Sequence, residues 1–178
     1  MAPTITTRRA TVADADTMLA IAEPGFASYA EFAPPGWRPR QVRNDRDRTV
    51  ALLERPDTWA LLALHDGTPV GHIAFTPARV RTAAEVPLET GERPLVPGLG
   101  HLWQLFVLPD WWGSGVAPLL HDAAIAEMRA QGYERARLFT PSGQARARRF
   151  YERRGWRPAD ERFNADSGLD LVEYRLEL

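Results

Sequence analysis

The feature that most restricts the fold of this chain is a strand, a glycine-bearing turn and a helix in immediate succession. Residues 101–108 are mostly apolar, which predicts a strand buried on both faces. Pro109 must end the pairing of that strand, and a turn over 110–115 leads into an amphipathic helix over 116–130. Another strand is expected over 135–140. This succession predicts a mixed α/β sheet with the strand–turn–helix–strand unit at its centre.

The other segments supply the rest of the sheet and its helices. Strands are expected over 5–10, 58–65 and 69–76, helices over 11–21, 41–54 and 145–154, and a final hairpin over 157–178. Residues 77–100 lack a hydrophobic period and contain four prolines and three glycines. They are therefore expected to form a long loop.

Length and composition exclude several classes of protein. The 178 residues suffice for a single domain with a hydrophobic core. All 22 basic residues are arginine and cysteine is absent, which excludes a disulfide framework, a catalytic cysteine, a Schiff-base lysine and a P-loop. The net charge of -1 gives no general attraction to nucleic acid, and no apolar run is long enough to span a membrane. The polar N-terminus is unlike a signal peptide, so we expect a cytoplasmic protein.

The turn over 110–115 is the best candidate for a binding site. Gly113, Ser114 and Gly115 are small, so backbone N–H groups can approach an anion where the next helix begins. The helix dipole favours negative charge there, and a phosphate group would suit the site. Glycines in a strand-to-helix turn can also serve only to form the turn, so the motif alone leaves both interpretations open.

A second motif follows at residues 147–156, where Phe150-Tyr151 precedes Gly155-Trp156. Together with the turn, the segment 101–156 resembles the GNAT family of N-acetyltransferases, which transfer an acetyl group from acetyl-CoA to an amine. The resemblance implies a single α/β domain with a mixed, mostly antiparallel sheet of six to seven strands, a splayed central parallel pair and about four helices. Residues 1–57 would form the first strand and the acceptor-side helices, 58–156 the cofactor-binding core and 157–178 a C-terminal hairpin.

The resemblance also implies which residues hold acetyl-CoA. The family's pyrophosphate motif is Gln or Arg, two residues, Gly, one residue, and then Gly or Ala. Gly115 and Ala117 match its end, whereas Trp112 stands in the place of the Gln or Arg. Backbone groups at the strand end and the Gln144 amide are implied to hold the pantetheine arm, and an arginine of the last helix to meet the 3'-phosphate. The expected cofactor-binding residues are Phe106, Val107, Trp112, Gly113, Ser114, Gly115, Val116, Ala117, Gln144 and Arg149.

Two side chains are candidates for proton transfer. By resemblance, Tyr151 protonates the departing thiolate while the backbone N–H of Val107 donates to the acyl oxygen. His101 is the candidate base for the amine, because an imidazole can take a proton near neutral pH. Simple core packing of Tyr151 and of His101 remains the alternative. His72, on a neighbouring strand, is a weaker candidate. His65 and His121 are expected to be surface residues. No metal is expected, because no two histidines have ligand spacing and cysteine is absent.

The acceptor pocket is implied to lie between the first two helices. The residues expected there are aromatic: Phe26, Tyr29, Phe32 and Trp37. With Glu23 and Glu31 nearby, they could hold a cationic amine, or they could serve only to cover the sheet. Glutamates in the loop 77–100 could form a lid.

The sequence therefore predicts an acetyl-CoA-dependent N-acetyltransferase for a primary amine of a small molecule or peptide. Direct attack in a ternary complex is expected, since no cysteine can carry the acyl group. An acyl-CoA-binding module without catalysis, another acyl donor and an O-linked acceptor stay open as alternatives. The nine arginines between 135 and 162 lack interleaved aromatic residues, so a solvated face is expected rather than a nucleic-acid surface. A homodimer through the terminal strands is the assembly that the resemblance implies.

Overall fold

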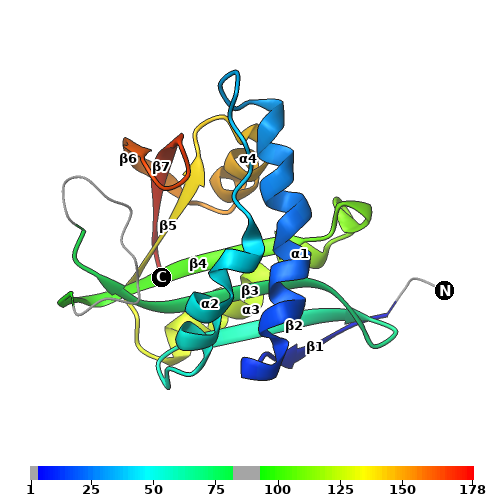
Figure 1. Ribbon diagram of the computed structural model, residues 1–178. Coiled ribbons are helices and arrows are strands. Elements are labelled where there is room, and N and C mark those ends of the chain that lie inside the picture. The colour runs from blue at the N-terminus through cyan, green and yellow to red at the C-terminus, as the bar shows by residue number, and fades with distance from the viewer. Residues whose placement is uncertain (1–3, 82–92) are drawn as a thin grey trace.

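The computed structural model describes residues 4–81 and 93–178, which form one seven-stranded sheet with helices on both faces (Figure 1). The strand order is β1-β2-β3-β4-β5-β7-β6, and every neighbouring pair is antiparallel except β4 and β5, which are parallel. The strands are β1 (Ile5–Arg9), β2 (Trp59–His65), β3 (Thr68–Arg79), β4 (Leu95–Val107), β5 (Arg135–Pro141), β6 (Arg157–Asn164) and β7 (Leu169–Glu177).

Four α-helices cover the sheet in the described part of the chain. They are α1 (Ala15–Ala27), α2 (Arg46–Leu53), α3 (Val116–Ala130) and α4 (Ala145–Arg153). Helices α1 and α2 lie on one face, and α3 and α4 on the other (Figure 1). This arrangement confirms the predicted fold, with its mostly antiparallel sheet and its central parallel pair. Over the same residues, none of the helices has the length and hydrophobicity that crossing a membrane requires.

The larger core lies between the sheet and the face covered by α3 and α4. The predicted apolar stripe of α3 supplies its buried side chains Leu120, Ala124 and Met128. Alternate residues of β5 and β7 point to the same side, with Leu138 and Tyr174 among the fully buried ones. A smaller core under α1 contains the apolar residues of β2 and β3 that point the other way.

The predicted loop over 77–100 is too long. Strand β3 continues to Arg79 and β4 already begins at Leu95, where these two residues pair. A register shift between Pro77 and Arg79 accommodates the irregular sequence, so pairing with a neighbouring strand outweighs the local preference of proline and glycine for loops. The glutamates of the predicted lid, Glu85, Glu89 and Glu92, lie outside the described residues.

His121 is not a surface residue, so that prediction is wrong. Its side chain is 4% exposed because Trp156, which follows α4, packs beside it. The Trp156 indole donates to His121 Nε2 at 2.9 Å, and His121 Nδ1 lies 3.0 Å from the Asp122 carboxylate. His121 thus joins α3 to the end of α4.

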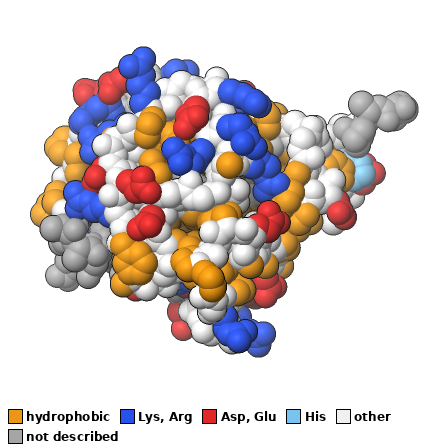
Figure 2. All heavy atoms as spheres, turned by 90° about the horizontal axis from the view of Figure 1, so that it is seen from above, with side chains coloured by type: hydrophobic (Ala, Val, Ile, Leu, Met, Phe, Trp, Pro, Cys, Tyr) orange, Lys and Arg blue, Asp and Glu red, His pale blue; other side chains and the backbone are white. Residues whose placement is uncertain are grey.

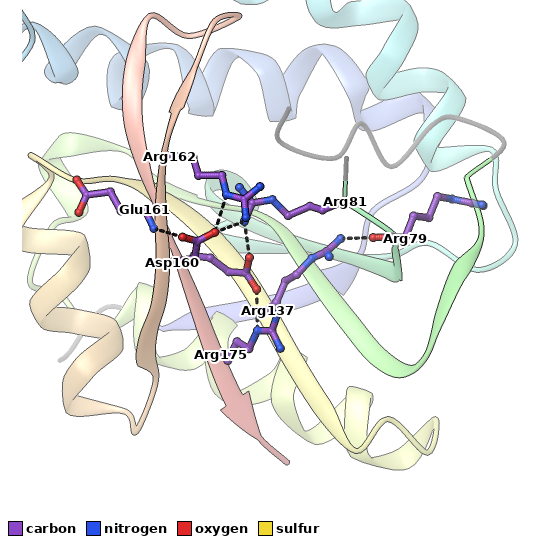
Figure 3. Close-up of polar contacts among 8 residues, drawn as sticks. Arg79, Arg81, Arg137, Asp160, Glu161, Arg162 and Arg175 are labelled. Carbon is purple, nitrogen blue, oxygen red and sulfur yellow. Dashed lines mark hydrogen bonds and ion pairs between the residues drawn. The ribbon is translucent and has the colours of Figure 1, made fainter. Parts of the chain in front are cut away.

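An ion-pair cluster around the buried Glu173 ties Arg81, just after β3, to β6 and β7 (Figure 3). The carboxylate of Glu173 contacts Arg81 Nη1 at 2.5 Å and Arg175 Nε at 2.7 Å. Asp160 lies 3.6 Å from Arg81 and 2.6 Å from Arg162. The cluster lies under the Phe139 ring of β5, whose centroid is 4.7 Å from the Arg81 guanidinium carbon.

Candidate functional site

The parallel strands β4 and β5 separate after three paired positions. Leu99, Gly100 and His101 pair with residues 135–137, after which β4 runs on to Val107 and β5 to Pro141 without pairing with each other. Figure 1 shows the two strands diverging toward α4 and the turn before α3. The expected splay of the central parallel pair is therefore present.

A cavity of about 890 Å³ occupies this opening. Its walls come from the diverging strands, the turn before α3, helix α4, the end of α1 and the turn between β6 and β7. Because residues from both faces of the sheet line it, the cavity passes through the plane of the sheet. It therefore brings side chains from the two faces of the sheet together between the diverging strands.

The free edge of β4 points backbone groups into the cavity. The N–H of Leu108 donates to Val70 on β3 at 2.9 Å, so the N–H and C=O of Val107 point the opposite way, toward β5. The Trp112 indole N–H donates to the Val107 carbonyl at 2.8 Å from that side. By the same alternation, Leu105 also presents its backbone to the cavity, a residue that the sequence did not single out.

Phe106 does not fit the backbone role that the resemblance implied. It pairs with His72 of β3, and its carbonyl lies against Gly71, where an added Cβ would be only 3.1 Å away. Its backbone therefore belongs to the β3 ladder, and it is the ring of Phe106 that lines the cavity. That ring packs so closely on α1 that an added Cβ at Gly25 would lie 2.5 Å from it.

The glycine turn has the form expected of an anion site. Gly113 and Gly115 have φ values of 81° and 93°, and an added Cβ at either would meet no atom within 4 Å. Both glycines line the cavity together with Trp112, Ala117 and the ring of Pro118. The small residues leave the backbone at the beginning of α3 open to a negatively charged group.

Two predicted residues of this turn do not line the cavity. The Ser114 hydroxyl donates to the Trp111 carbonyl at 2.6 Å, which holds it within the turn. Val116 is buried in the core below α3. Both shape the turn, and the backbone N–H of Ser114 donates to the same Trp111 carbonyl at 3.3 Å.

Helix α4 and the residue before it bring three polar side chains to the cavity. Gln144, the residue before the helix, and Arg149, both expected to bind the cofactor, line the cavity. Arg146 lines it as well, and its guanidinium carbon lies 3.2 Å from the centroid of the Trp112 ring. The sequence showed a basic helix, but it did not show which arginine would contact the turn.

Tyr151 is both a core residue and a cavity residue. It is 7% exposed and packs against Phe150, Trp156 and Tyr174, while it also lines the cavity. Its hydroxyl makes no hydrogen bond to another described residue. Burial, with a smaller contribution from nearby Tyr29, raises the pKa of Tyr151, so the hydroxyl holds its proton at neutral pH and can donate it.

His101 lies where the two strands part, at the last pair of the parallel ladder. It lines the cavity, is 4% exposed and packs 5.5 Å from the Phe139 ring. Burial, together with the charges of Arg137 and Arg48, lowers the pKa of His101 well below its ordinary value of 6.5. The imidazole is therefore neutral at physiological pH and has a lone pair with which to accept a proton.

Gln104 is a polar residue of the cavity that sequence reasoning missed. Its Oε1 lies 3.0 Å from Nε2 of His72, which is fully buried and does not line the cavity. Burial lowers the pKa of His72 to about 4, so His72 is neutral and donates from Nε2. The Gln104 oxygen is thus occupied, and its amide nitrogen can donate to a ligand. A single amide in an otherwise apolar strand was the available signal.

Three of the four predicted acceptor-side aromatics line the cavity: Phe26, Tyr29 and Trp37. The fourth, Phe32, packs on Gly143 instead, where an added Cβ would lie 2.4 Å from its ring. The Trp37 indole donates to the Ser167 carbonyl at 2.7 Å, which ties the segment after α1 to the turn between β6 and β7. Glu23 and Glu31 are exposed and do not line the cavity. Across the described ranges, no cluster of three or more residues forms a metal site.

Comparison with known proteins agrees with this geometry. The model of the acetyltransferase (GNAT) family matches residues 23–156, well over half of the chain. No curated protein matches the sequence. Many solved structures share the fold, and three of them illustrate the likeness.

The first is a protein of Desulfovibrio desulfuricans assigned to the GNAT family of acetyltransferases, at 22% identity and a TM-score of 0.71, covering 98% of this chain and 99% of that one. The second is the PaiA N-acetyltransferase of Thermoplasma acidophilum in complex with coenzyme A, at 17% identity and a TM-score of 0.69, covering 97% and 99%. The third is the ribosomal-protein-S18-alanine N-acetyltransferase of Escherichia coli, at 15% identity and a TM-score of 0.68, covering 98% and 94%. At these identities the likeness shows the fold.

Proposed function

This chain belongs to the acetyltransferase (GNAT) family, and from that premise we propose that it is an acetyl-CoA-dependent N-acetyltransferase acting on a primary amine in a ternary complex. The observation that carries the proposal is the opening between β4 and β5, whose cavity is lined by the free edge of Val107 and by Tyr151. The coenzyme A complex of the Thermoplasma relative and the alanine acceptor named for the Escherichia relative support the cofactor and the amine.

The residues present fit a coenzyme A thioester. The backbone of Leu105, which does not pair with β5, suits the amide groups of a pantetheine arm, and the turn with Gly113 and Gly115 suits phosphates. At Val107 only the N–H is available, because its carbonyl accepts from the Trp112 indole. Bound acetyl-CoA would supply an activated acyl group. Gln144, just before α4, and Arg149 on α4 would contact the cofactor from the wall of the cavity that this helix forms.

Each chemical requirement of the transfer then has a residue. The Val107 N–H donates to the acyl oxygen as that oxygen gains negative charge. Tyr151 gives its proton to the sulfur as the carbon–sulfur bond breaks and the carbon–nitrogen bond forms, and it keeps that proton until then because burial raises its pKa.

The proton of the attacking amine leaves on the acceptor side. His101 is the side chain placed to accept it. Because burial and the charges of Arg137 and Arg48 lower its pKa, the imidazolium is short-lived and the proton must pass on to another group. The same positive charges disfavour a protonated acceptor amine. They therefore increase the fraction of the bound amine that is neutral and able to attack the acyl carbon. The Gln104 amide nitrogen is placed to orient the acceptor.

A thiol-release screen with acetyl-CoA against diverse amines and short peptides tests this proposal. We expect release of free coenzyme A with at least one class of acceptor. In Tyr151→Phe, the turnover number should fall about 10²-fold, the contribution typical of a general acid, while the affinity for coenzyme A stays unchanged.

Binding of acetyl-CoA without thiol release over the whole panel would identify a binding protein instead of an enzyme. Normal turnover of Tyr151→Phe across the pH range would remove the general-acid role. The matched control is Tyr133→Phe, since Tyr133 lies at the far end of α3 and does not line the cavity.

A further inference from the structure

The guanidinium of Arg146 lies over the Trp112 ring in the wall of the cavity. Both line the cavity and both remain accessible to solvent. We propose that Arg146, held against the Trp112 indole, binds the diphosphate of coenzyme A. The inference rests on the proposed function, because it assigns one contact within the same cofactor site.

The Trp112 ring is a fixed support. Its indole N–H donates to the Val107 carbonyl at 2.8 Å, which fixes the ring between the end of β4 and the turn before α3. The guanidinium carbon of Arg146 lies 3.2 Å from the ring centroid. Arginine favours this arrangement because its planar guanidinium stacks on aromatic faces.

Stacking orients the guanidinium without occupying its donors. All five N–H groups of a guanidinium lie in its plane, so a ring against one face leaves them available to a phosphate. Arg146 makes no hydrogen bond and no ion pair with the described residues. Its neighbour Arg148, in contrast, donates to the Tyr174 hydroxyl and to the Ser142 carbonyl, each at 3.0 Å.

The charge of the turn explains why a side chain from α4 is needed. Residues 109–118 contain no basic residue and include Asp110, whereas a diphosphate carries at least two negative charges. The backbone N–H groups of the turn supply only partial charge. Arg146 of α4 lies against the turn, over its Trp112 ring.

The surface around this site is consistent with an anionic ligand that approaches from outside. Figure 2 views the end of the molecule where α4 lies in Figure 1, and basic side chains gather in runs on this face. Arg149 and Arg153 also line the cavity and lie further along α4. The diphosphate contact is therefore distinct from the contact with the 3'-phosphate that was expected of Arg149.

Calorimetric binding of coenzyme A and 3'-dephospho-coenzyme A, with NMR titration of pantetheine, tests the assignment on the full chain. In Arg146→Gln we expect the affinity for both coenzymes to fall by the same factor, about ten-fold or more, and the affinity for pantetheine to stay unchanged. The difference in coenzyme affinity between Arg146→Gln and the unmodified protein should become smaller as the salt concentration rises. In Trp112→Leu the affinity should also fall, and combining it with Arg146→Gln should add little, because the ring acts through the guanidinium.

The control is Arg157→Gln, an exposed arginine on β6 that does not line the cavity, for which no affinity should change. A loss with coenzyme A but not with the dephospho form would move the contact to the 3'-phosphate and overturn the proposal. An equal loss with pantetheine would show a structural role instead. Unchanged affinity in Arg146→Gln would show that Arg146 does not bind the diphosphate, and either result overturns the proposal. If the unmodified protein itself fails to bind coenzyme A, the proposed function fails, which is a separate result.

Discussion

The carboxylate of Glu173 forms ion pairs with two arginine side chains. It is buried on β7 and lies within 2.7 Å of both Arg81 and Arg175. The Arg81 side chain is itself only 12% exposed, so without Glu173 its main compensation would be Asp160 at 3.6 Å. Removing one partner of a buried pair leaves a charge that water cannot solvate.

We therefore expect Glu173→Gln to lower the free energy of unfolding by about 3 kcal/mol, measured by urea denaturation. Glu177→Gln is the matched control, because Glu177 lies on the same strand and the same face but is exposed. Its unfolding free energy should change by no more than about 0.5 kcal/mol. Equal stability of Glu173→Gln and the unmodified protein would mean that the arginines of this cluster are solvated by other means.

Residue-scale prediction from the sequence was most successful where a residue type has one common use. Tyr151, Gly113 and Gly115 lie at the cavity as expected. His121 and Gln104 were misjudged or missed, because their roles depend on partners, Trp156 and His72, that are distant in sequence. A side chain's partner across the fold has no local signature.

At the scale of elements, two of the contacts made by the segment between α1 and α2 attach it to the opposite wall of the cavity. Phe32 packs on Gly143, in the turn before α4, and Trp37 donates to the Ser167 carbonyl. These contacts place Tyr29 and Trp37 on the same side of the cavity as Phe26 of α1. The sequence predicted this aromatic segment as the acceptor side, but not what would hold it there.

Gly143→Ala tests this attachment, because the new methyl group would lie 2.4 Å from the Phe32 ring and displace it. We expect a loss of about 1–3 kcal/mol in unfolding free energy and a higher KM for the acceptor amine, with the affinity for coenzyme A unchanged. The measurements are urea denaturation, steady-state kinetics and calorimetry.

The control is the double variant Gly143→Ala with Phe32→Leu, in which the smaller side chain makes room for the methyl group. It should recover most of the stability and the KM. If Gly143→Ala alone has the acceptor KM of the unmodified protein, the Phe32 contact does not position the acceptor side.

At the scale of the whole molecule, three buried histidines make stability depend on pH. Burial is the main reason why the pKa of His72 is lowered to about 4. It is also the main reason why the pKa values of His101 and His121 lie below 6.5. The folded protein keeps these residues neutral, whereas the unfolded chain binds protons below pH 6.5. Stability is therefore full above pH 6.5 and is lost as pH falls toward the folded-state pKa values.

Between pH 7.5 and pH 5.5, we expect the free energy of unfolding to fall, with about two to three protons taken up on unfolding at the lower pH. His72 alone would contribute about 3 kcal/mol by pH 4, given the shift from 6.5 to about 4. Urea denaturation at several pH values measures the slope. In His72→Gln the uptake should decrease by about one proton, whereas a stability independent of pH in this range would contradict the assigned burial of the three rings.

The sequence by itself determined the order of the elements, the central strand–turn–helix unit and the family, because periodicity, glycine and proline act locally and the motif of residues 101–156 is contiguous. Only the tertiary structure decided where β4 and β5 separate, which backbone groups face the opening and that Arg146 stacks on Trp112. It also extended β3 and β4 into the predicted loop. These features depend on register and on packing between segments far apart in the chain, and neither is specified by the residues of one segment alone.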